Sequence, residues 1–266
     1  MFYKYIYLFL LLLSTYTKAQ EQLYIHFNPQ KGKIGNIYIL EPSGIFVLNN
    51  RAKLQAVIIG KFKQNTIIPT INDYNKGLIP KRFQTKNIEI YTYQLKEINY
   101  ANKYPVDPEF ADLPVSINHF KISYYDNYYD DEVLKGKIKS IGKVKLKYFN
   151  KYYLDEKIKG SLAKIGTYKI ELSNSYYKPE SFGYVNKIGS VRIKYSKSHY
   201  KEALNGLVTG IGAYKISYFK DANNRHLGEF KEINGFDNSF VLLNLINTFG
   251  NSTIKRVRVG IDRQKR

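Results

Sequence analysis

The tridecapeptide GKIKSIGKVKLKY, residues 136–148, contains the whole pattern on which this chain is built. It holds two short segments joined at Ile141-Gly142, and both segments return along the chain with a period of 22 to 24 residues. Self-similarity at a fixed period indicates a repeat architecture, in which each unit needs its neighbours. The joints are Ile117-Asn118, Ile141-Gly142, Ile165-Gly166, Ile188-Gly189, Ile211-Gly212 and Ile233-Asn234.

Each unit is predicted to be a β-hairpin. In the second segment apolar residues alternate with lysines, which indicates a strand with one apolar and one basic face. Glycine at the joint permits the positive φ of a tight turn, and Asn118 and Asn234 are the usual substitutes. Residues 117–236 therefore predict an all-β fold, an antiparallel meander of five tandem β-hairpin repeats. Its apolar face must be buried by closure into a barrel, by folding as a sandwich, or by cover from residues 20–116.

The rest of the chain divides into three segments by its sequence pattern. Residues 20–98 predict an N-terminal β region, with strands at 23–27, 36–40, 44–48, 56–62 and 87–95. Three prolines in 99–116 favour a linker or an irregular cover segment. Residues 237–266 form a C-terminal segment with a basic tail, in which 240–249 predicts a short helix, with a strand as the alternative.

Residues 1–19 have the pattern of a cleavable signal peptide. Lys4 precedes an apolar run that is too short for a membrane span, and small residues precede Gln20. We expect export to the periplasm, the cell surface or the exterior. The chain has no cysteine, which excludes disulfides, thiolate metal sites and a lipid-anchored N-terminus.

The formal net charge of +20 favours anionic partners. One cation recurs at the same place in successive units, and these five residues, the cationic row, are the candidate anion-binding residues: Lys121, Lys145, Lys169, Arg192 and Lys215. The alternative is an ordinary solvated face, enriched in lysine because the chain favours residues with AT-rich codons.

A second candidate binding group is a repeated aromatic pair near the polar ends of the hairpins. Exposed tyrosine rings stack on sugars or bases, whereas the alternative is that one ring of each pair packs inward. The candidate aromatic residues are Tyr128, Tyr129, Tyr152, Tyr153, Tyr176, Tyr177 and Tyr200.

No catalytic motif stands out. The acids at Asp126 and 130–132 lack the spacing of a calcium loop and are interpreted as turn residues, and the four histidines share no ligand spacing. The sequence predicts no catalytic residue, no metal site and no cofactor.

The pattern G-x-I-x-x-I-G-x-V-x-I-x-Y in 136–148 resembles secreted β-repeat proteins of Gram-negative bacteria of the Bacteroidota type, a resemblance that covers the array alone and implies export. We expect a non-enzymatic protein that binds or scaffolds at the cell envelope. Its expected partner is an anionic polysaccharide or another envelope polymer, without specific nucleic-acid recognition. The alternatives are an outer-membrane β-barrel and a hydrolase with unrecognised carboxylates.

Overall fold

The computed structural model describes residues 22–60, 81–85, 88–92, 97–101, 113–126, 131–152, 155–173, 179–198, 201–220, 227–235 and 241–245. These residues form two β-sheets and two single-turn 3₁₀ helices, η3 (Pro179–Ser181) and η4 (Glu202–Leu204). The prediction of an all-β meander is confirmed. No helix among the described residues is long and apolar enough to cross a membrane.

The N-terminal sheet has seven strands in the order β19-β1-β2-β3-β4-β6-β5. Strand β19 pairs with β1, and β6 with β4, in parallel, whereas the other pairs are antiparallel. The strands are β1 (Gln22–Asn28), β2 (Lys33–Glu41), β3 (Gly44–Asn49), β4 (Leu54–Ile59), β5 (Lys81–Thr85), β6 (Ile88–Thr92) and β19 (Val241–Leu245).

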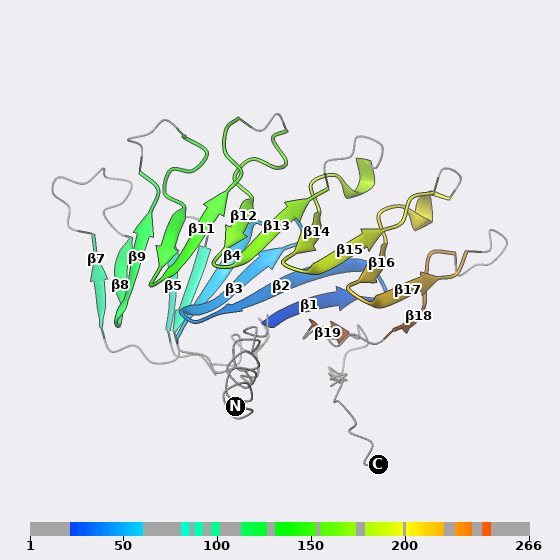
Figure 1. Cartoon of the computed structure of the whole chain (residues 1–266), viewed down its shortest axis with the longest axis horizontal. Helices are drawn as coiled ribbons and strands as arrows, with labels where there is room; N and C mark the ends of the chain where they lie inside the picture. Colours follow the sequence, from blue (N-terminus) through cyan, green and yellow to red (C-terminus); the bar gives the residue numbers. More distant parts are fainter. Residues whose placement is uncertain are drawn as a thin grey trace, which may run out of the picture.

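The array sheet has twelve strands in simple chain order and is antiparallel throughout. Among the described strands it is open, with β7 at one edge and β18 at the other (Figure 1). The strands are β7 (Ile98–Tyr100), β8 (Pro114–Ile117), β9 (Phe120–Tyr124), β10 (Ile138–Ile141), β11 (Val144–Tyr148), β12 (Leu162–Ile165), β13 (Tyr168–Leu172), β14 (Val185–Ile188), β15 (Val191–Tyr195), β16 (Val208–Ile211), β17 (Tyr214–Tyr218) and β18 (Phe230–Asn234).

Each hairpin has a leading strand before the turn and a trailing strand after it. The turns contain the predicted joint residues in the left-handed region, including Gly142 at φ 55° and Asn118 at φ 53°. Such a φ is strained for most side chains but open to glycine and asparagine, which explains the residue types at the joints.

Every leading strand contains a β-bulge. Ile138 and Ile141 are three positions apart, yet both are fully buried, which a regular strand with a side-chain period of two cannot achieve. One extra residue between them restores the inward direction, because Ile138 pairs with Tyr124 while Ser140 pairs with Ser123. The extra residues in successive leading strands are Val115, Lys139, Ala163, Asn186, Thr209 and Lys231.

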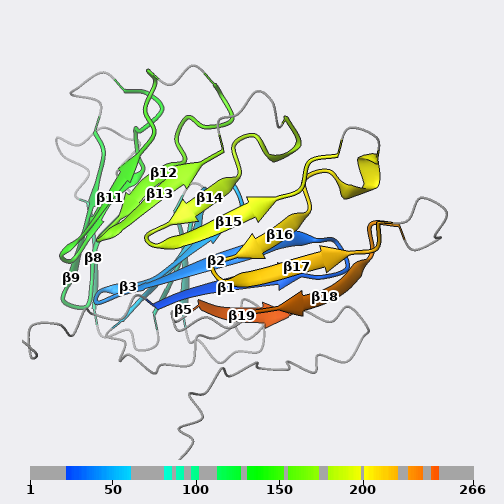
Figure 2. The same ribbon diagram turned by 45° about the vertical axis from the view of Figure 1, so that its right-hand side comes forward.

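The apolar faces of the two sheets pack against each other in one core. Residues of the N-terminal sheet such as Ile25 and Phe46 belong to the same buried cluster as Leu146 and Ile170 of the array. In Figure 2, β1 to β3 run roughly along β15 to β17, which is the aligned packing of a β-sandwich. Of the predicted ways to bury the array, cover by the N-terminal β region is the one observed.

The array also contacts the turns of the N-terminal sheet. The amide of Val208 donates to the carbonyl of Gly32 in the β1–β2 turn at 2.8 Å. The amides of Leu162 and Val185 donate to the β3–β4 turn, each at 2.8 Å. At the opposite end of the strands, the Thr167 amide donates to the Glu41 carboxylate at 3.2 Å. These bonds set the position of the array along the strands of the N-terminal sheet.

Three predictions are wrong in part. Of the segment 240–249, residues 241–245 form a strand, β19, which was the alternative to the predicted helix, because Val241 to Leu245 pair with the edge of β1. The linker proposed over 99–116 includes β8 and part of β7, with Pro114 as the first residue of its strand, where a missing amide is tolerated. Asn234 does not form a turn, since it ends β18 opposite Lys215. The proposed signal peptide lies outside the described residues.

Candidate anion-binding surface

The five cations of the cationic row lie where the alternation predicts. Each is the second residue of a trailing strand, and each is exposed on the outer face of the array. The neighbouring apolar residues point into the core: Val144, Leu146, Ile170, Ile193 and Ile216 are at most 4% exposed. The predicted division between a core face and a basic face is therefore confirmed.

The structure adds a second row of residues from the leading strands. Directly across from the cationic row lie, in order, Ser116, Ser140, Lys164, Lys187 and Gly210. The first two and the last are small and uncharged, whereas the third and fourth are lysines. The cations are therefore doubled over the middle of the array and single at its ends.

Like charges face each other across this middle region. Lys164 lies between Lys147 on one side and Lys169 on the other, and Lys187 lies opposite Arg192. Like charges directly opposite each other on a sheet are destabilising. We call Lys145, Lys147, Lys164, Lys169, Lys187, Arg192 and Lys194 the cationic band.

One carboxylate lies within the band. Among the described outer-face residues of β10 to β16, Glu171 is the only acid. It lies 3.2 Å from the Lys169 ammonium and 3.8 Å from that of Lys187. The hydrogen bond from Lys169 holds the pKa of Glu171 below its usual value, with Coulomb attraction to the nearby cations acting in the same direction. Glu171 offsets part of the repulsion and leaves the band with a large positive surplus.

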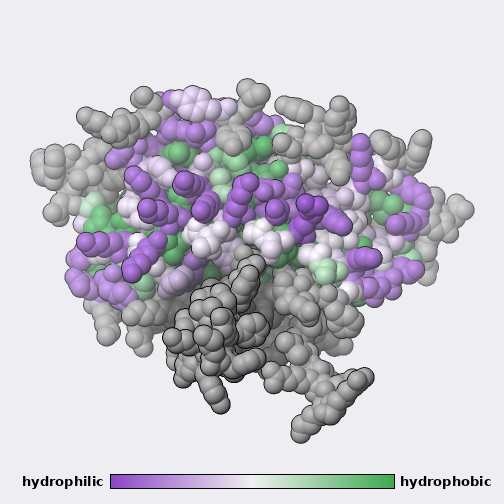
Figure 3. All heavy atoms as spheres, in the orientation of Figure 1, coloured by the Kyte–Doolittle hydropathy of each residue, from purple (hydrophilic) through white to green (hydrophobic). Residues whose placement is uncertain are grey.

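The cationic row, with the band at its middle, has the dimensions of a track for a polymer. Equivalent trailing strands are two strand spacings apart, about 10 Å, so the cationic row extends over about 40 Å. This pitch is close to the Debye length of ~8 Å at physiological salt, so a bound chain would interact with successive cations in turn. In the space-filling view, hydrophilic residues gather in a band across the front of the molecule (Figure 3).

Of the candidate aromatic residues, only Tyr152 lies within the described part of the chain. It is 77% exposed, and the Lys151 ammonium lies 5.5 Å from the centre of its ring. A ring this open is accessible to a ligand, although it lies in a connection rather than on the cationic band. Tyr128, Tyr129, Tyr153, Tyr176, Tyr177 and Tyr200 lie outside the described residues.

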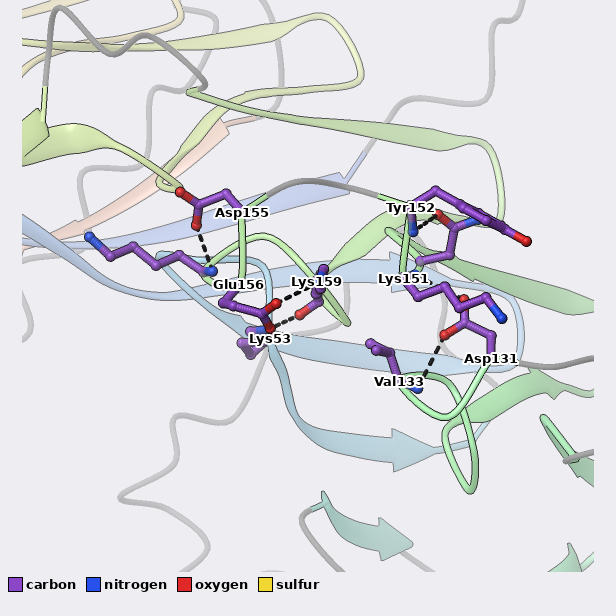
Figure 4. Close-up of polar contacts among 10 residues, drawn as sticks. Lys53, Asp131, Val133, Lys151, Tyr152, Asp155, Glu156 and Lys159 are labelled. Atoms are coloured by element: carbon purple, nitrogen blue, oxygen red, sulfur yellow. Dashed lines mark hydrogen bonds and ion pairs between the residues drawn. The ribbon is translucent and has the colours of Figure 1, made fainter.

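Carboxylates of acidic residues in the connections accept hydrogen bonds from backbone amides. The Asp131 carboxylate accepts from Val133 at 3.1 Å and from Lys151, in the next connection, at 3.0 Å (Figure 4). Asp155 accepts from the Lys157 amide at 2.7 Å. The interpretation of Asp131 as a turn residue is confirmed, and its role in linking consecutive connections was not foreseen.

Sequence reasoning missed Lys164 and Lys187. Both immediately precede the joint isoleucine, at a position where other units have Ser140, Gly210 and Glu232, so no constant residue type marks it. The signal that could have found them is pairing: in a hairpin with a two-residue turn, this position faces the second residue of the trailing strand.

Comparison of the chain with family models, with curated proteins and with solved structures finds no match.

Proposed function

We propose that this protein is an exported, non-enzymatic binding protein that holds an anionic polymer of the cell envelope along the outer face of its array. The observation that carries the proposal is the doubling of cations over β12 to β15. The inner residues of the array are fixed by the core, whereas the outer residues are free to vary, and here they place like charges opposite each other at a cost in stability. An anionic ligand relieves that repulsion.

The surface suits a polymer better than a small anion. The band is a strip of lysines and one arginine, all exposed except the half-buried Lys187, and many contacts of low individual strength are the means by which such a strip gains affinity. Acidic polysaccharides present repeated charges along one chain, which matches repeated cations at a regular pitch. Binding of this kind is strongly dependent on salt, because exposed charges are screened.

The test is retention on a heparin-like resin. The band variant replaces Lys145, Lys164, Lys169 and Lys187 with Gln together, and the matched control replaces Lys31, Lys33, Lys197 and Lys220, which are exposed outside the band. Both variants lose four charges and both should fold. We expect the band variant to elute at clearly lower salt than the control.

Two results would count against the proposal. Equal elution of the two variants would mean that the resin senses net charge alone. Retention of the wild type above about 0.5 M salt, where the Debye length is only about 4 Å, would assign binding to the aromatic residues.

A further inference from the structure

The two edges of the array are complementary halves of one repeat. Strand β18 carries the leading-strand pattern, with its bulge and its two inward residues Phe230 and Ile233. No trailing strand follows it among the described residues, and it pairs with β17 alone. Within the part of the chain that the structure describes, the array therefore ends on the first half of a hairpin.

The opposite edge, β7, is a trailing strand. The Asn118 amide donates to the Glu97 carbonyl at 2.8 Å, as the Gly142 amide donates to Lys121 one unit later. Likewise Ala101 donates to Leu113, as Tyr125 donates to Lys137. By these equivalent bonds, Glu97, directly before β7, holds the position that Lys121 of the cationic row holds in β9. Among the described strands, β7 pairs with β8 alone, so none of them serves as its leading strand.

We propose that a second copy of this chain supplies the missing half, by pairing its β18 with β7 of the first copy. Neighbouring strands of the array run in opposite directions, and the array contains twelve strands counted from β7 to β18. Because twelve is an even number, β7 and β18 themselves run in opposite directions. A β18 edge placed beside β7 is therefore antiparallel to it, as in every hairpin of the array. The contact is head to tail, so it repeats and generates an open-ended filament with a continuous outer face.

Tyr100 marks the unfinished edge. In four trailing strands the last tyrosine donates its hydroxyl to the carbonyl of the first residue of the preceding strand: Tyr124 to Pro114, Tyr148 to Ile138, Tyr195 to Val185 and Tyr218 to Val208. Tyr100 holds the equivalent position and is 48% exposed. The equivalent acceptor in the junction is the carbonyl of Phe230 from the second copy.

The register of the junction also sets a charge pair. Glu232 holds the leading-strand position of Lys164 and Lys187, which face Lys169 and Arg192. By the same register Glu232 of one copy faces Glu97 of the next. Two carboxylates in direct opposition weaken the junction, so exchange of either one for a cation should strengthen it.

The experiment is sedimentation velocity over a concentration series at physiological ionic strength, without added polymer. Glu97→Lys and Glu232→Lys should each lower the apparent Kd for association by at least roughly twofold, through an open series of oligomers. The double variant, with two lysines opposed, should associate as weakly as the wild type. Glu202→Lys, in the connection between β15 and β16, controls for the change in net charge.

A hydroxyl deletion tests the same edge independently. In the Glu97→Lys background, Tyr100→Phe should weaken association roughly fivefold while leaving the thermal unfolding of the monomer unchanged. The proposal is overturned if neither single variant associates more strongly than Glu202→Lys, or if the double variant associates as strongly as the singles. Association that stops at a dimer at the highest concentrations, instead of continuing to larger oligomers, overturns the proposal as well.

Discussion

The tyrosine hydroxyls that tie four of the trailing strands to their leading strands should contribute measurably to stability. Tyr124, Tyr148, Tyr195 and Tyr218 donate to backbone carbonyls at 2.8, 3.0, 2.8 and 2.7 Å. Burial raises the pKa of all four, so each remains a neutral donor at any ordinary pH. Replacement by phenylalanine keeps the ring and removes only the hydrogen bond.

The magnitude follows from one such hydrogen bond in each of these four trailing strands. Loss of a partly buried hydrogen bond costs about 1 kcal/mol, and more where the acceptor is left without a partner. The sites are roughly 10 Å or more apart, so their effects should add to about 4 kcal/mol for the quadruple variant. In a chain of this size that corresponds to a fall in Tm of roughly 8–16 °C.

Urea unfolding of the four single variants and the quadruple variant measures this directly. The midpoint should fall stepwise while the m-value stays constant, because the surface exposed on unfolding is unchanged. Tyr152→Phe is the control, since that ring is 77% exposed and should have no effect. A total loss below about 1 kcal/mol in the quadruple variant would refute the reasoning, because burial alone would then account for the tyrosines.

Three further predictions concern single positions. Gly166→Ala should destabilise by at least about 1–2 kcal/mol in urea unfolding, because φ is 52° and a Cβ would lie 2.0 Å from the Glu41 carboxylate. Asn118→Gly keeps the turn conformation and should cost less, about 1 kcal/mol or below, because it removes the side-chain oxygen that accepts from the Glu97 amide at 3.3 Å. Burial lowers the pKa of His26 to about 4, so its stabilising contribution is complete above about pH 6.5 and is lost as the pH falls toward 4. His26→Gln should remove this slope, of at most roughly 1.4 kcal/mol per pH unit, and an unchanged slope would contradict the assignment. Glu171→Gln should raise the salt concentration needed to elute the protein from a heparin-like resin, because the band loses its one described acid; a lower value would contradict its neutralising role.

The repeats could be predicted from sequence because the residues within each unit determine its local geometry. Alternation in the trailing strands and glycine at the joints require only the period of a strand and the conformational freedom of glycine. The bulges could not be predicted in this way, although Ile138 and Ile141 carry the signal in their spacing of three. That spacing conflicts with a regular strand, and only the partner strand shows that an extra residue resolves it.

Pairings between distant segments were beyond the reach of the pattern. Residues 241–245 have the composition of either a buried helix or a strand, and the free edge of β1 decides in favour of the strand. The same limit applies to the cationic band. One member of each cross-strand pair is visible as a periodic residue, whereas Lys164 and Lys187 become part of the surface only through their partners.

The two faces of the array have separate constraints, and this separation is what makes the outer face suitable for binding. Inward residues contact the N-terminal sheet, and leading-strand amides such as that of Val208 bond to its turns, so the spacing between units is fixed from the inside. The exposed outward residues of the described strands do not belong to the buried core. Position 164 and its equivalents in the neighbouring units can therefore hold Ser140, Lys187 or Gly210 without any change in the register of the sheet. A protein built in this way can change its ligand by substitution at these outer positions while its core remains the same.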